Sequence, residues 1–364
     1  MSSTFGTNLR VTIFGESHGP AIGAVIDSPP AGILLDRQYI LTQIHRRAPG
    51  QDASATPRRE QDIPQFLSGI LEGKTTGAPI TLIIKNNNIH PQDYENLRRF
   101  PRPSHADYAA SVRYGGFQDV SGGGHFSGRL TAPLVAAASI FRPALERQGI
   151  FIGGHVSQIG SVKDDLFDPI AVTAEQLKKL SGEYFSVIKP RMQPKMRAEI
   201  KAAAAAHDSV GGAVELAVVG LPAGLGDPMF NGLENRISQA LFGVPAVKAV
   251  AFGAGFGFAS ARGSEVNDSM YYNENGEVCC RTNFCGGITG GISNGAPLIV
   301  SVALKPTPSI AKAQQTVDLL DKKNAELKIR GRHDPCIVPR ALPALEAALT
   351  FAIADLLFGT KGTL

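Results

Sequence analysis

The sequence predicts a compact fold that mixes helices and strands, and three observations predict it. Seven short runs rich in Val, Ile and Phe, each bounded by Gly or Pro, have the composition of strands. Four longer stretches have the apolar spacing of helices. Hydrophobic residues make up 43% of the 364 residues, and no low-complexity or Pro/Ser-rich linker divides them. We therefore expect residues 1–364 to form one compact domain.

The expected elements follow from local composition and from helix-end signals. The strands are expected at residues 9–14, 23–27, 79–85, 150–156, 213–219, 246–252 and 298–304. The first helix follows Asp36, a candidate N-cap, and ends on the basic pair Arg46 and Arg47. The other helices are expected at residues 127–147, 199–206 and 341–358. The last of these is almost wholly apolar, so we expect it to be buried on several sides.

A short similarity suggests an internal repeat. Residues 23–32 resemble residues 212–224, because both read as a strand that ends in a Pro-Ala-Gly turn and is followed by a helix. Two related halves would explain the length without a linker. Chance similarity between two strand–turn units is the alternative.

Composition and charge exclude several classes of protein. Glycine contributes 40 of the 364 residues, above the usual share of roughly 7%, but without the three-residue period of collagen. The apolar content is too high for a disordered chain. The net charge of +4 is too mild for a general nucleic-acid binder and fits a few concentrated arginine sites for a small anion.

The cysteines and the N-terminus indicate a reduced compartment. Four cysteines are too few for a disulfide framework, and they lack the spacing of a zinc site: Cys279, Cys280, Cys285 and Cys336. We expect buried thiols and no metal. The N-terminus shows no signal peptide, and the uncharged stretch between Arg281 and Lys305 is too rich in Gly and Asn for a membrane span. A cytoplasmic protein with no membrane partner is expected.

Two loops combine a histidine with small residues or arginine. Residues 15–19 read Gly-Glu-Ser-His-Gly directly after a strand, so His18 can approach a ligand closely and Ser17 can orient its proton. Residues 102–107 read Arg-Pro-Ser-His-Ala-Asp and hold His105 before a helix for which Asp107 is the expected N-cap. A structural turn and a solvated capping loop are the respective alternatives.

Three further loops have features of anion-binding sites. Residues 122–129 carry three glycines ahead of a helix start, an arrangement that aims backbone amides at an anion, although a glycine-rich turn without ligand is the alternative. Residues 305–309 place Lys305 beside Thr307 and Ser309, as a phosphate grip would require. Residues 330–336 cluster Arg332 with Asp334, and the arginine would keep the aspartate ionised.

These loops predict a histidine-assisted enzyme that acts on a phosphorylated small molecule; a nucleotide-like cofactor is compatible with them. The alternative is a nucleotide- or RNA-binding protein that uses the arginines at 46–47, 58–59 and 98–102. Only 7% of the residues are aromatic and none is tryptophan, which disfavours base stacking and hence that alternative.

Taken together, the motifs resemble the chorismate synthase family in the same order along almost the whole chain. The motifs that carry the resemblance include residues 14–19, 46–51, 56–62, 102–107, 122–129, 245–248, 286–292, 305–307 and 331–335. The resemblance implies conversion of 5-enolpyruvylshikimate 3-phosphate to chorismate and phosphate, an anti-1,4-elimination that needs reduced FMN (FMNH2) without net redox change. It also implies an α+β fold, with helices packed between two antiparallel sheets, and a homotetramer. Chains of this length resemble the forms that rely on an external flavin reductase, with NADPH as the source of electrons.

The resemblance also implies roles for individual residues. His18 would assist the departing phosphate as an acid, with Ser17 in its hydrogen-bond chain, while His105 would manage a proton on the flavin N1 side and Asp334 would serve N5. Ser127 would complete the catalytic set. The substrate would be held by Arg46, Arg47, Arg129 and Arg332, with Arg47 also assigned to NADP. The flavin would be held by His125, Phe126, Ser127, Pro245, Ala246, Gly290, Lys305, Pro306, Thr307, Pro308, Ser309 and Arg332. His125 and Phe126 depart from the arginine and serine that are usual in the family.

Overall fold

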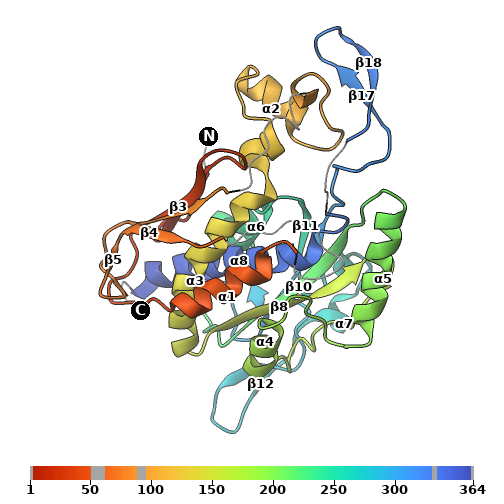
Figure 1. The fold of residues 1–364 in the computed structure, drawn as a ribbon. Helices are drawn as coiled ribbons and strands as arrows, with labels where there is room; N and C mark the ends of the chain where they lie inside the picture. The colour runs from red at the N-terminus through yellow and green to blue at the C-terminus, as the bar shows by residue number, and fades with distance from the viewer. Residues whose placement is uncertain (1–2, 51–61, 88–95, 330–333, 362–364) are drawn as a thin grey trace.

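Two five-stranded antiparallel sheets enclose a layer of helices in the computed structural model of the chain (Figure 1), which describes residues 3–50, 62–87, 96–329 and 334–361. The first sheet contains β1 (Thr4–Phe5), β2 (Arg10–Gly15), β3 (Ala21–Asp27), β7 (Ile80–Lys85) and β4 (Gln65–Ser68), in that spatial order. The second contains β11 (Val247–Phe252), β16 (Leu298–Leu304), β10 (Gly212–Val219), β8 (Phe151–Ile159) and β9 (Val162–Lys163). All seven strands expected from the sequence are confirmed, with small shifts at their ends.

Three helices form the central layer: α1 (Arg37–Arg47), α3 (Thr131–Arg147) and α8 (Val338–Lys361). They pack on one another, while α3 also contacts β3 and β7, and α8 contacts β8 and β10. The sandwich implied by the family resemblance is therefore confirmed. Asp36 caps α1 as expected, because its carboxylate accepts a hydrogen bond of 2.9 Å from the Tyr39 amide.

The helix α8 is long and apolar enough to cross a membrane, but its surroundings show another role. In the span Val338–Phe358, 94% of the most apolar window is buried inside the protein. One apolar core cluster includes side chains from α8, from α1 and α3 and from both sheets. The apolar character of α8 is thus used by the core. The expectation that residues 1–364 form one domain stays a prediction, which this shared core supports.

The remaining helices lie outside the central layer. They are α2 (Asp107–Tyr114), α4 (Ala174–Leu180), α5 (Met192–Ala205), α6 (Leu233–Phe242) and α7 (Gly263–Val266). Leu177 of α4 belongs to a small apolar cluster with Ala217 of β10 and Ile299 of β16, whereas their neighbours Leu216 and Val300 belong to the main core. Since neighbouring residues of a strand point to opposite faces, α4 covers the outer face of the second sheet.

In the described part of the chain, four small hairpins extend from the sandwich, and short 3-10 turns lead into several of its helices. The hairpins are β5 (Ile70–Leu71) with β6 (Lys74–Thr75), β12 (Met270–Tyr272) with β13 (Val278–Cys280), β14 (Ile288–Thr289) with β15 (Ile292–Ser293), and β17 (Gln314–Asp318) with β18 (Lys323–Leu327). The 3-10 turns are η2 (Ser121–Phe126), η3 (Gly128–Leu130), η4 (Met229–Asn231) and η5 (Gly255–Ser260).

The two halves of the chain repeat one topology. In space, β2-β3-β7-β4 of the first half corresponds to β8-β10-β16-β11 of the second, so in both halves the fourth strand in chain order lies beside the second. A helix follows the second strand in each half, α1 or α6. A small hairpin precedes the fourth strand, and a long helix, α3 or α8, follows it. The internal repeat expected from the sequence is confirmed at the level of topology.

Both halves also repeat one hydrogen-bonded clasp between the Pro-Ala-Gly turn and the small hairpin. The Thr75 hydroxyl donates to the Pro30 carbonyl at 2.6 Å and accepts from the Ile33 amide at 2.9 Å. The Ser293 hydroxyl donates to the Pro222 carbonyl, also at 2.6 Å, and accepts from an amide at 2.9 Å. Both hydroxyl-bearing residues are buried. The similarity of the two halves therefore extends beyond the turn from which the sequence suggested it.

We expect Thr75→Val and Ser293→Ala to destabilise the protein by similar amounts, about 1–3 kcal/mol each, because each leaves a buried amide without its acceptor and a proline carbonyl without its donor. Urea unfolding measures the change. Thr289→Val, at an exposed position of the β14–β15 hairpin, is the matched control. Its free energy of unfolding should lie within about 0.5 kcal/mol of the wild-type value. Equal stability of all three variants would show that the clasps contribute nothing.

Candidate active site

A cavity of about 800 Å³ collects loops from both halves of the chain. This volume lies near the top of the range of roughly 300–1,000 Å³ that is usual for small-molecule sites. Its walls combine apolar side chains, such as Ile13, Leu134 and Phe351, with a cluster of basic and hydroxyl-bearing residues. A cavity of this size and composition can hold a large anionic ligand, or two small ones.

The structure brings most of the expected site residues together around this cavity. The expected residues that line it are Ser17, Arg47, His105, His125, Phe126, Ser127, Arg129, Pro245, Ala246, Lys305, Thr307, Pro308, Ser309 and Asp334. His18 is buried directly beside Ser17. Four expected residues are not among the lining residues in the described part of the chain: His18, Arg46, Gly290 and Pro306. Gly290 forms the turn between β14 and β15, and Arg332 lies outside the described residues.

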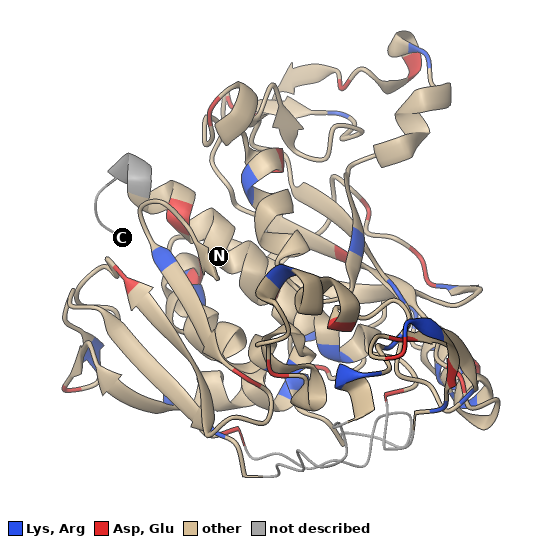
Figure 2. Ribbon diagram, turned by 90° about the horizontal axis from the view of Figure 1, so that it is seen from above, with Lys and Arg blue, Asp and Glu red and all other residues tan. Residues whose placement is uncertain are grey.

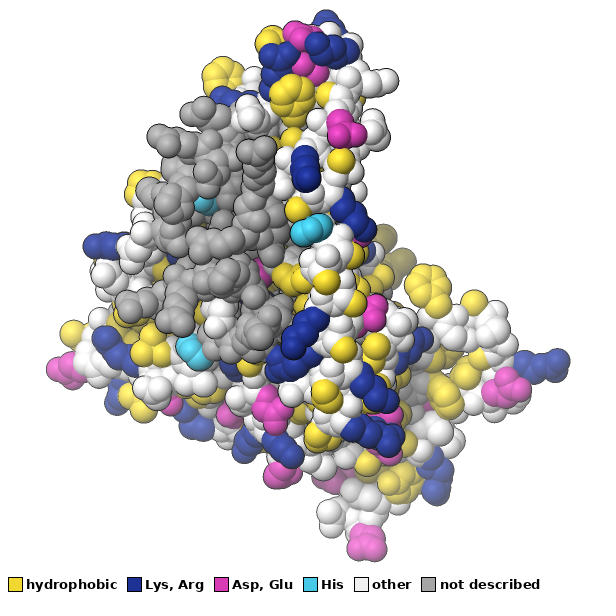
Figure 3. Space-filling model, turned by 45° about the vertical axis from the view of Figure 1, so that its right-hand side comes forward, with side chains coloured by type: hydrophobic (Ala, Val, Ile, Leu, Met, Phe, Trp, Pro, Cys, Tyr) yellow, Lys and Arg dark blue, Asp and Glu magenta, His cyan; other side chains and the backbone are white. Residues whose placement is uncertain are grey.

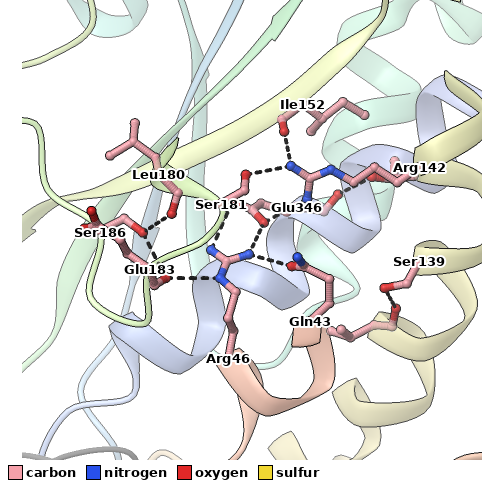
Figure 4. A network of polar contacts seen from close by, with 12 residues as sticks. Gln43, Arg46, Ser139, Arg142, Ile152, Leu180, Ser181, Glu183, Ser186 and Glu346 are labelled. Carbon is pink, nitrogen blue, oxygen red and sulfur yellow. Dashed lines mark hydrogen bonds and ion pairs between the residues drawn. The ribbon is translucent and has the colours of Figure 1, made fainter. Parts of the chain in front are cut away.

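Arg46 belongs to a buried ion-pair network in the helix layer (Figure 4). Its Nη1 donates to Glu346 Oε2 of α8 at 2.8 Å and to Gln43 Oε1 at 2.7 Å. Arg142 of α3 donates to the same Glu346 oxygen at 3.0 Å. Burial alone would raise the pKa of Glu346, but the charges of Arg46 and Arg142 outweigh it and hold the pKa below its ordinary value. Arg46 of α1 and Arg142 of α3 thus share one carboxylate of α8, which links the three helices.

Arg47 and Arg129 share one buried carboxylate. Asp62, whose side chain is 1% exposed, accepts from Arg47 Nη1 at 3.2 Å and from Arg129 Nη1 at 2.8 Å. Arg47 also donates to the Thr131 hydroxyl at 3.0 Å, and Arg129 donates to Asn86 Oδ1 at 2.7 Å. Two cations against one anion leave a net positive charge at the cavity wall, with both guanidinium groups fixed in orientation.

The triple-glycine loop packs directly against the first histidine motif. A Cβ atom added to Gly122 would lie 2.1 Å from His18 Cε1 and 3.0 Å from Ser17 Oγ. Gly122 also has φ +59°, a left-handed conformation that disfavours other residues. The Ser17 amide donates to the Gly124 carbonyl at 3.1 Å. Glycine is therefore needed here to let the loop approach Ser17 and His18.

His105 is held by a carboxylate and a guanidinium. Its Nδ1 lies 2.6 Å from Asp107 Oδ1 and 3.1 Å from Arg102 Nη2. Arg102 grips both oxygens of Asp107, at 2.7 and 2.8 Å, and donates to the Ser309 hydroxyl at 3.1 Å. Burial alone would raise the pKa of Asp107, but hydrogen bonds from Arg102 and His105 outweigh it and hold the pKa well below its usual range.

Asp107 does not have the capping role expected from the sequence. Ala106 occupies the N-cap position of α2 and makes no side-chain cap, while Asp107 is the first helical residue. Its carboxylate points back to the loop, where it also accepts from the Arg102 amide at 3.0 Å. The expectation of an Asp107 N-cap is wrong because these loop donors compete successfully for the carboxylate.

The two residues that depart from the family pattern have distinct environments. His125 Nδ1 lies 2.8 Å from the Gly15 carbonyl, and its Nε2 lies 2.7 Å from the Ser3 hydroxyl. A carbonyl only accepts, so Nδ1 carries a proton, and both ring nitrogens are engaged within the protein. Phe126 is 36% exposed and its ring centroid lies 6.4 Å from that of Tyr114. It offers the cavity an apolar surface.

Lys305 lines the cavity and has a second lysine, Lys248, near it on the neighbouring strand. The Lys305 ammonium donates to the Ser104 carbonyl, and its backbone amide donates to the Ala246 carbonyl at 3.0 Å. Burial and, secondarily, the charge of Lys248 lower the pKa of Lys305. The pairing of β11 with β16 is irregular between Val247 and Ala249, which places Lys248 at a bulge. Lys248 lies in a motif of the resemblance, residues 245–248, but received no role from the sequence.

Asp334 is paired with an arginine that the sequence reasoning missed. Its Oδ2 accepts from Arg340 Nη1, in the first turns of α8, and Arg340 Nε donates to the Arg47 carbonyl at 3.2 Å. Asp334 and Arg340 both line the cavity. The carboxylate therefore has a cationic neighbour, Arg340, within the described chain, whereas the sequence had suggested Arg332, which lies outside the described residues.

A lobe above the sandwich carries the His105 loop (Figure 1). It consists of the segment 96–126, which follows β7, and the β17–β18 hairpin, which follows β16. Arg99 donates to Asp318 at 2.6 and 2.8 Å and to Asp321 at 2.7 Å, and its carbonyl accepts from the Leu319 amide at 3.0 Å. The tip of the hairpin, at the top of Figure 3, mixes basic, acidic and hydrophobic side chains. Equivalent insertions of the two halves thus contact each other in this lobe.

Charges of both signs are scattered through the described chain (Figure 2). Many arginines on which an RNA-binding alternative would depend are paired with a carboxylate, namely Arg46 with Glu346, Arg47 with Asp62, Arg99 with Asp318 and Arg102 with Asp107. Within the described ranges, no group of three or more His, Cys, Asp or Glu side chains is arranged to hold a metal ion. The concentrated positive charge is at the cavity.

Sequence reasoning missed the carboxylates that organise the site. Asp62 lay in a motif of the resemblance but received no role, and Asp107 was assigned to a helix cap. The signal that could have identified them is the excess of arginines in these same motifs, since a buried guanidinium needs a charged partner. The partner itself could not be chosen, because Asp62 lies 67 residues from Arg129 in the chain.

Comparisons with known proteins agree with one another. The family model described as chorismate synthase matches residues 9–358. A chorismate synthase of Korarchaeum cryptofilum is 43% identical over 354 residues, which cover 96% of each chain. One from Dehalococcoides mccartyi is 44% identical over 356 residues, 98% of this chain and 96% of the relative. A crystal structure of chorismate synthase superposes with a TM-score of 0.75 at 26% identity, covering 98% of this chain and 94% of the other.

We expect Gly122→Ala to destabilise the protein by more than about 1 kcal/mol, because the new Cβ would overlap His18 and the backbone is left-handed. Gly128→Ala is the matched control from the same loop, since a Cβ there meets no atom within 4 Å. Thermal unfolding of both variants checks this. A Gly122→Ala protein as stable as the control would show that the loop has room to move away from His18.

Proposed function

The chain belongs to the chorismate synthase family, and we propose that the 800 Å³ cavity is where it converts 5-enolpyruvylshikimate 3-phosphate to chorismate and phosphate with reduced FMN. The enzyme is a lyase of aromatic amino-acid biosynthesis. One observation supports this location. Loops that are far apart in the chain, such as those of Ser17 and Asp334, converge on one cavity with histidines, arginines and a lysine of the family motifs.

The residues present fit a reduced flavin mononucleotide. A flat ring system needs a wide cavity with apolar walls, and the walls include Phe126, Leu134 and Ile337. A phosphate needs cationic and hydroxyl donors, and Lys305, Thr307 and Ser309 lie together on one strand end. Gly122, which also lines the cavity, has no side chain and so lets its backbone pack against His18. When bound, reduced FMN supplies electron density to the substrate as phosphate leaves.

The substrate's phosphate and carboxylates are assigned to the arginine pair. Arg47 and Arg129 face the cavity, and Asp62 fixes both without cancelling their charge. Arg340 adds a third guanidinium on the same wall, beside Asp334. A rigid arrangement of guanidinium groups suits anions with two oxygens in one plane, because each can form paired hydrogen bonds. Arg332 completes the proposed set from the sequence alone.

The proposed acid–base groups come from three separate loops, which carry His18, His105 and Asp334. His18 donates a proton to the departing phosphate, and Ser17 beside it orients that proton. His105 holds or releases a proton at the ring nitrogen not engaged by Asp107. Asp334 acts as the carboxylate base, with Ser127 at the start of the helical turn that carries Arg129. A histidine suits either proton role because its ordinary pKa lies near neutrality.

The finer partner assignments rest on the family. We propose a homotetramer in the cytoplasm, with a separate flavin reductase supplying FMNH2 and NADPH as the ultimate reductant. Several large apolar side chains support an interface between copies, because they are almost fully exposed in the single chain: Phe117 at 95%, Phe230 at 84% and Phe256 at 89%. The role of Arg47 toward NADP stays a prediction.

Turnover should require only substrate and pre-reduced FMN under anaerobic conditions, with product followed by its absorbance. We expect His18→Ala and His105→Ala each to lower kcat by about 10²–10⁴-fold, as for the loss of a general acid or base. His45→Ala, at an exposed position of α1, is the control and should retain wild-type kcat. No chorismate from the wild type would overturn the proposed function, and wild-type rates in both variants would overturn the role assignment.

Lys305→Gln should weaken FMN binding by about 10–100-fold, because it removes a charged partner of the phosphate. Riboflavin, which lacks the phosphate, should bind the variant and the wild type equally well. Flavin fluorescence titration measures both. Lys312→Gln, from an exposed lysine paired with Asp208, is the control. Equal losses for FMN and riboflavin would place Lys305 away from the phosphate.

A further inference from the structure

Buried Arg102, Asp107 and Ser309 form a cluster with half-buried His105, and its carboxylate has no role yet in the proposed reaction. Asp107 is 6% exposed and Arg102 is also 6% exposed, so neither is a surface charge. Oδ1 of Asp107 accepts a hydrogen bond from Arg102 Nη2 and lies next to His105 Nδ1. Oδ2 accepts hydrogen bonds from Arg102 Nε and from the Arg102 backbone amide. A carboxylate with four donors is saturated and fixed in place.

Two neighbours compete to define the protonation of His105 Nδ1. An arginine only donates, so the Arg102 contact at 3.1 Å would favour a bare Nδ1. An ionised carboxylate only accepts, so the Asp107 contact at 2.6 Å favours a proton on Nδ1. The carboxylate is nearer by half an ångström, and both oxygens of Asp107 are already held by the same Arg102. The guanidinium therefore supports the carboxylate rather than the imidazole.

We propose that Asp107 is a positioning residue that fixes His105 as the Nδ1–H tautomer, so that Nε2 alone exchanges a proton with the bound ligands. The Nε2 edge lies against the triple-glycine loop: a Cβ added to Gly123 would be 3.2 Å from both Cε1 and Nε2. Backbone without side chains thus adjoins the reactive edge. His105 also lines the cavity, whereas Asp107 does not.

The anchoring extends to the proposed phosphate grip. Arg102 Nη1 donates to the Ser309 hydroxyl, and the Lys305 ammonium donates to the Ser104 carbonyl. The loop 102–107 is therefore tied at two points to residues 305–309, which line the same cavity. Ser104 itself is left-handed, with φ +59°, a conformation that surrounding contacts must maintain. The geometry sets the direction of the His105 ring relative to the ligand that residues 305–309 would hold.

This inference rests on the proposed function for its catalytic meaning, but its first test needs no ligand. The protein contains eight histidines, so ¹⁵N labelling at histidine alone gives a tractable NMR spectrum, and His105→Gln identifies the His105 signals. We expect the Nδ1–H form of neutral His105 in the wild type and its loss in Asp107→Asn. A wild-type His105 protonated at Nε2 would overturn the proposal, whether or not the enzyme turns over.

Kinetics provide the second test. Asp107→Asn should lower kcat by about 10–100-fold, the usual effect of removing the group that orients a functional histidine, with little change in substrate KM. In a His105→Gln background the same change should cause no further loss of kcat, because Asp107 acts through His105. Asp107→Glu, which keeps the charge, should recover part of the rate. If the losses of kcat are additive in the double variant, Asp107 does not act through His105 and has only a structural role.

Asp318→Asn is the matched control, because Asp318 is also a buried carboxylate that pairs with an arginine of the lobe. It should leave the His105 tautomer unchanged, and its effect on kcat should persist in the His105→Gln background. If Asp107→Asn fails to fold, the wild-type tautomer and Asp107→Glu still decide the question. An inactive wild type would instead count against the proposed function and leave the tautomer result standing.

Discussion

The central layer depends on the ion pairs that the Glu346 carboxylate forms with Arg46 and Arg142. This carboxylate lies at the meeting point of α1, α3 and α8 and binds Arg46 and Arg142 at once. Two guanidinium groups in an apolar interior would be strongly unfavourable without it, since buried charges must be paired. Because Arg46 is held there, the next residue, Arg47, leaves α1 in the direction of the cavity. The position of the active-site arginine is thus set by a contact inside the core.

The same arrangement of one carboxylate with two cationic or proton-bearing groups recurs around the site. Asp62 holds Arg47 and Arg129, and Asp107 holds Arg102 and His105. Each carboxylate orients its partners; Asp62 offsets only part of the positive charge of its two arginines, whereas Asp107 balances the charge of Arg102. An anionic ligand therefore meets guanidinium groups that have already lost their conformational freedom, which lowers the entropic cost of binding. The carboxylates organise the site even though the ligands are anions.

Much of the fold could be predicted from the sequence, because strand composition and the Asp36 cap are local signals. The site could be predicted only in part. Arg46 and Arg47 are adjacent and chemically identical, yet successive residues of a helix point about 100° apart, so one meets Glu346 and the other meets the cavity. Nothing local distinguishes them. Gly290 shows a second limit of sequence motifs. Its left-handed φ of +61° meets the need of a hairpin turn, and the motif alone does not tell whether a glycine serves a turn or contacts a ligand.

The cavity is built from equivalent segments of the internal repeat, yet the two halves supply it with different chemical groups. After α1 the chain passes through Pro49 and Gly50, with φ +78° at the glycine; after α6 it passes through Pro245 and Ala246, with φ +74°. An alanine maintained in the left-handed region is held there by its surroundings, here including the Lys305 amide on its carbonyl. The first half contributes imidazole and guanidinium groups to the cavity wall, and the second contributes an ammonium group and the Asp334–Arg340 pair. Equivalent loops that carry different side chains thus form one cavity that is chemically asymmetric.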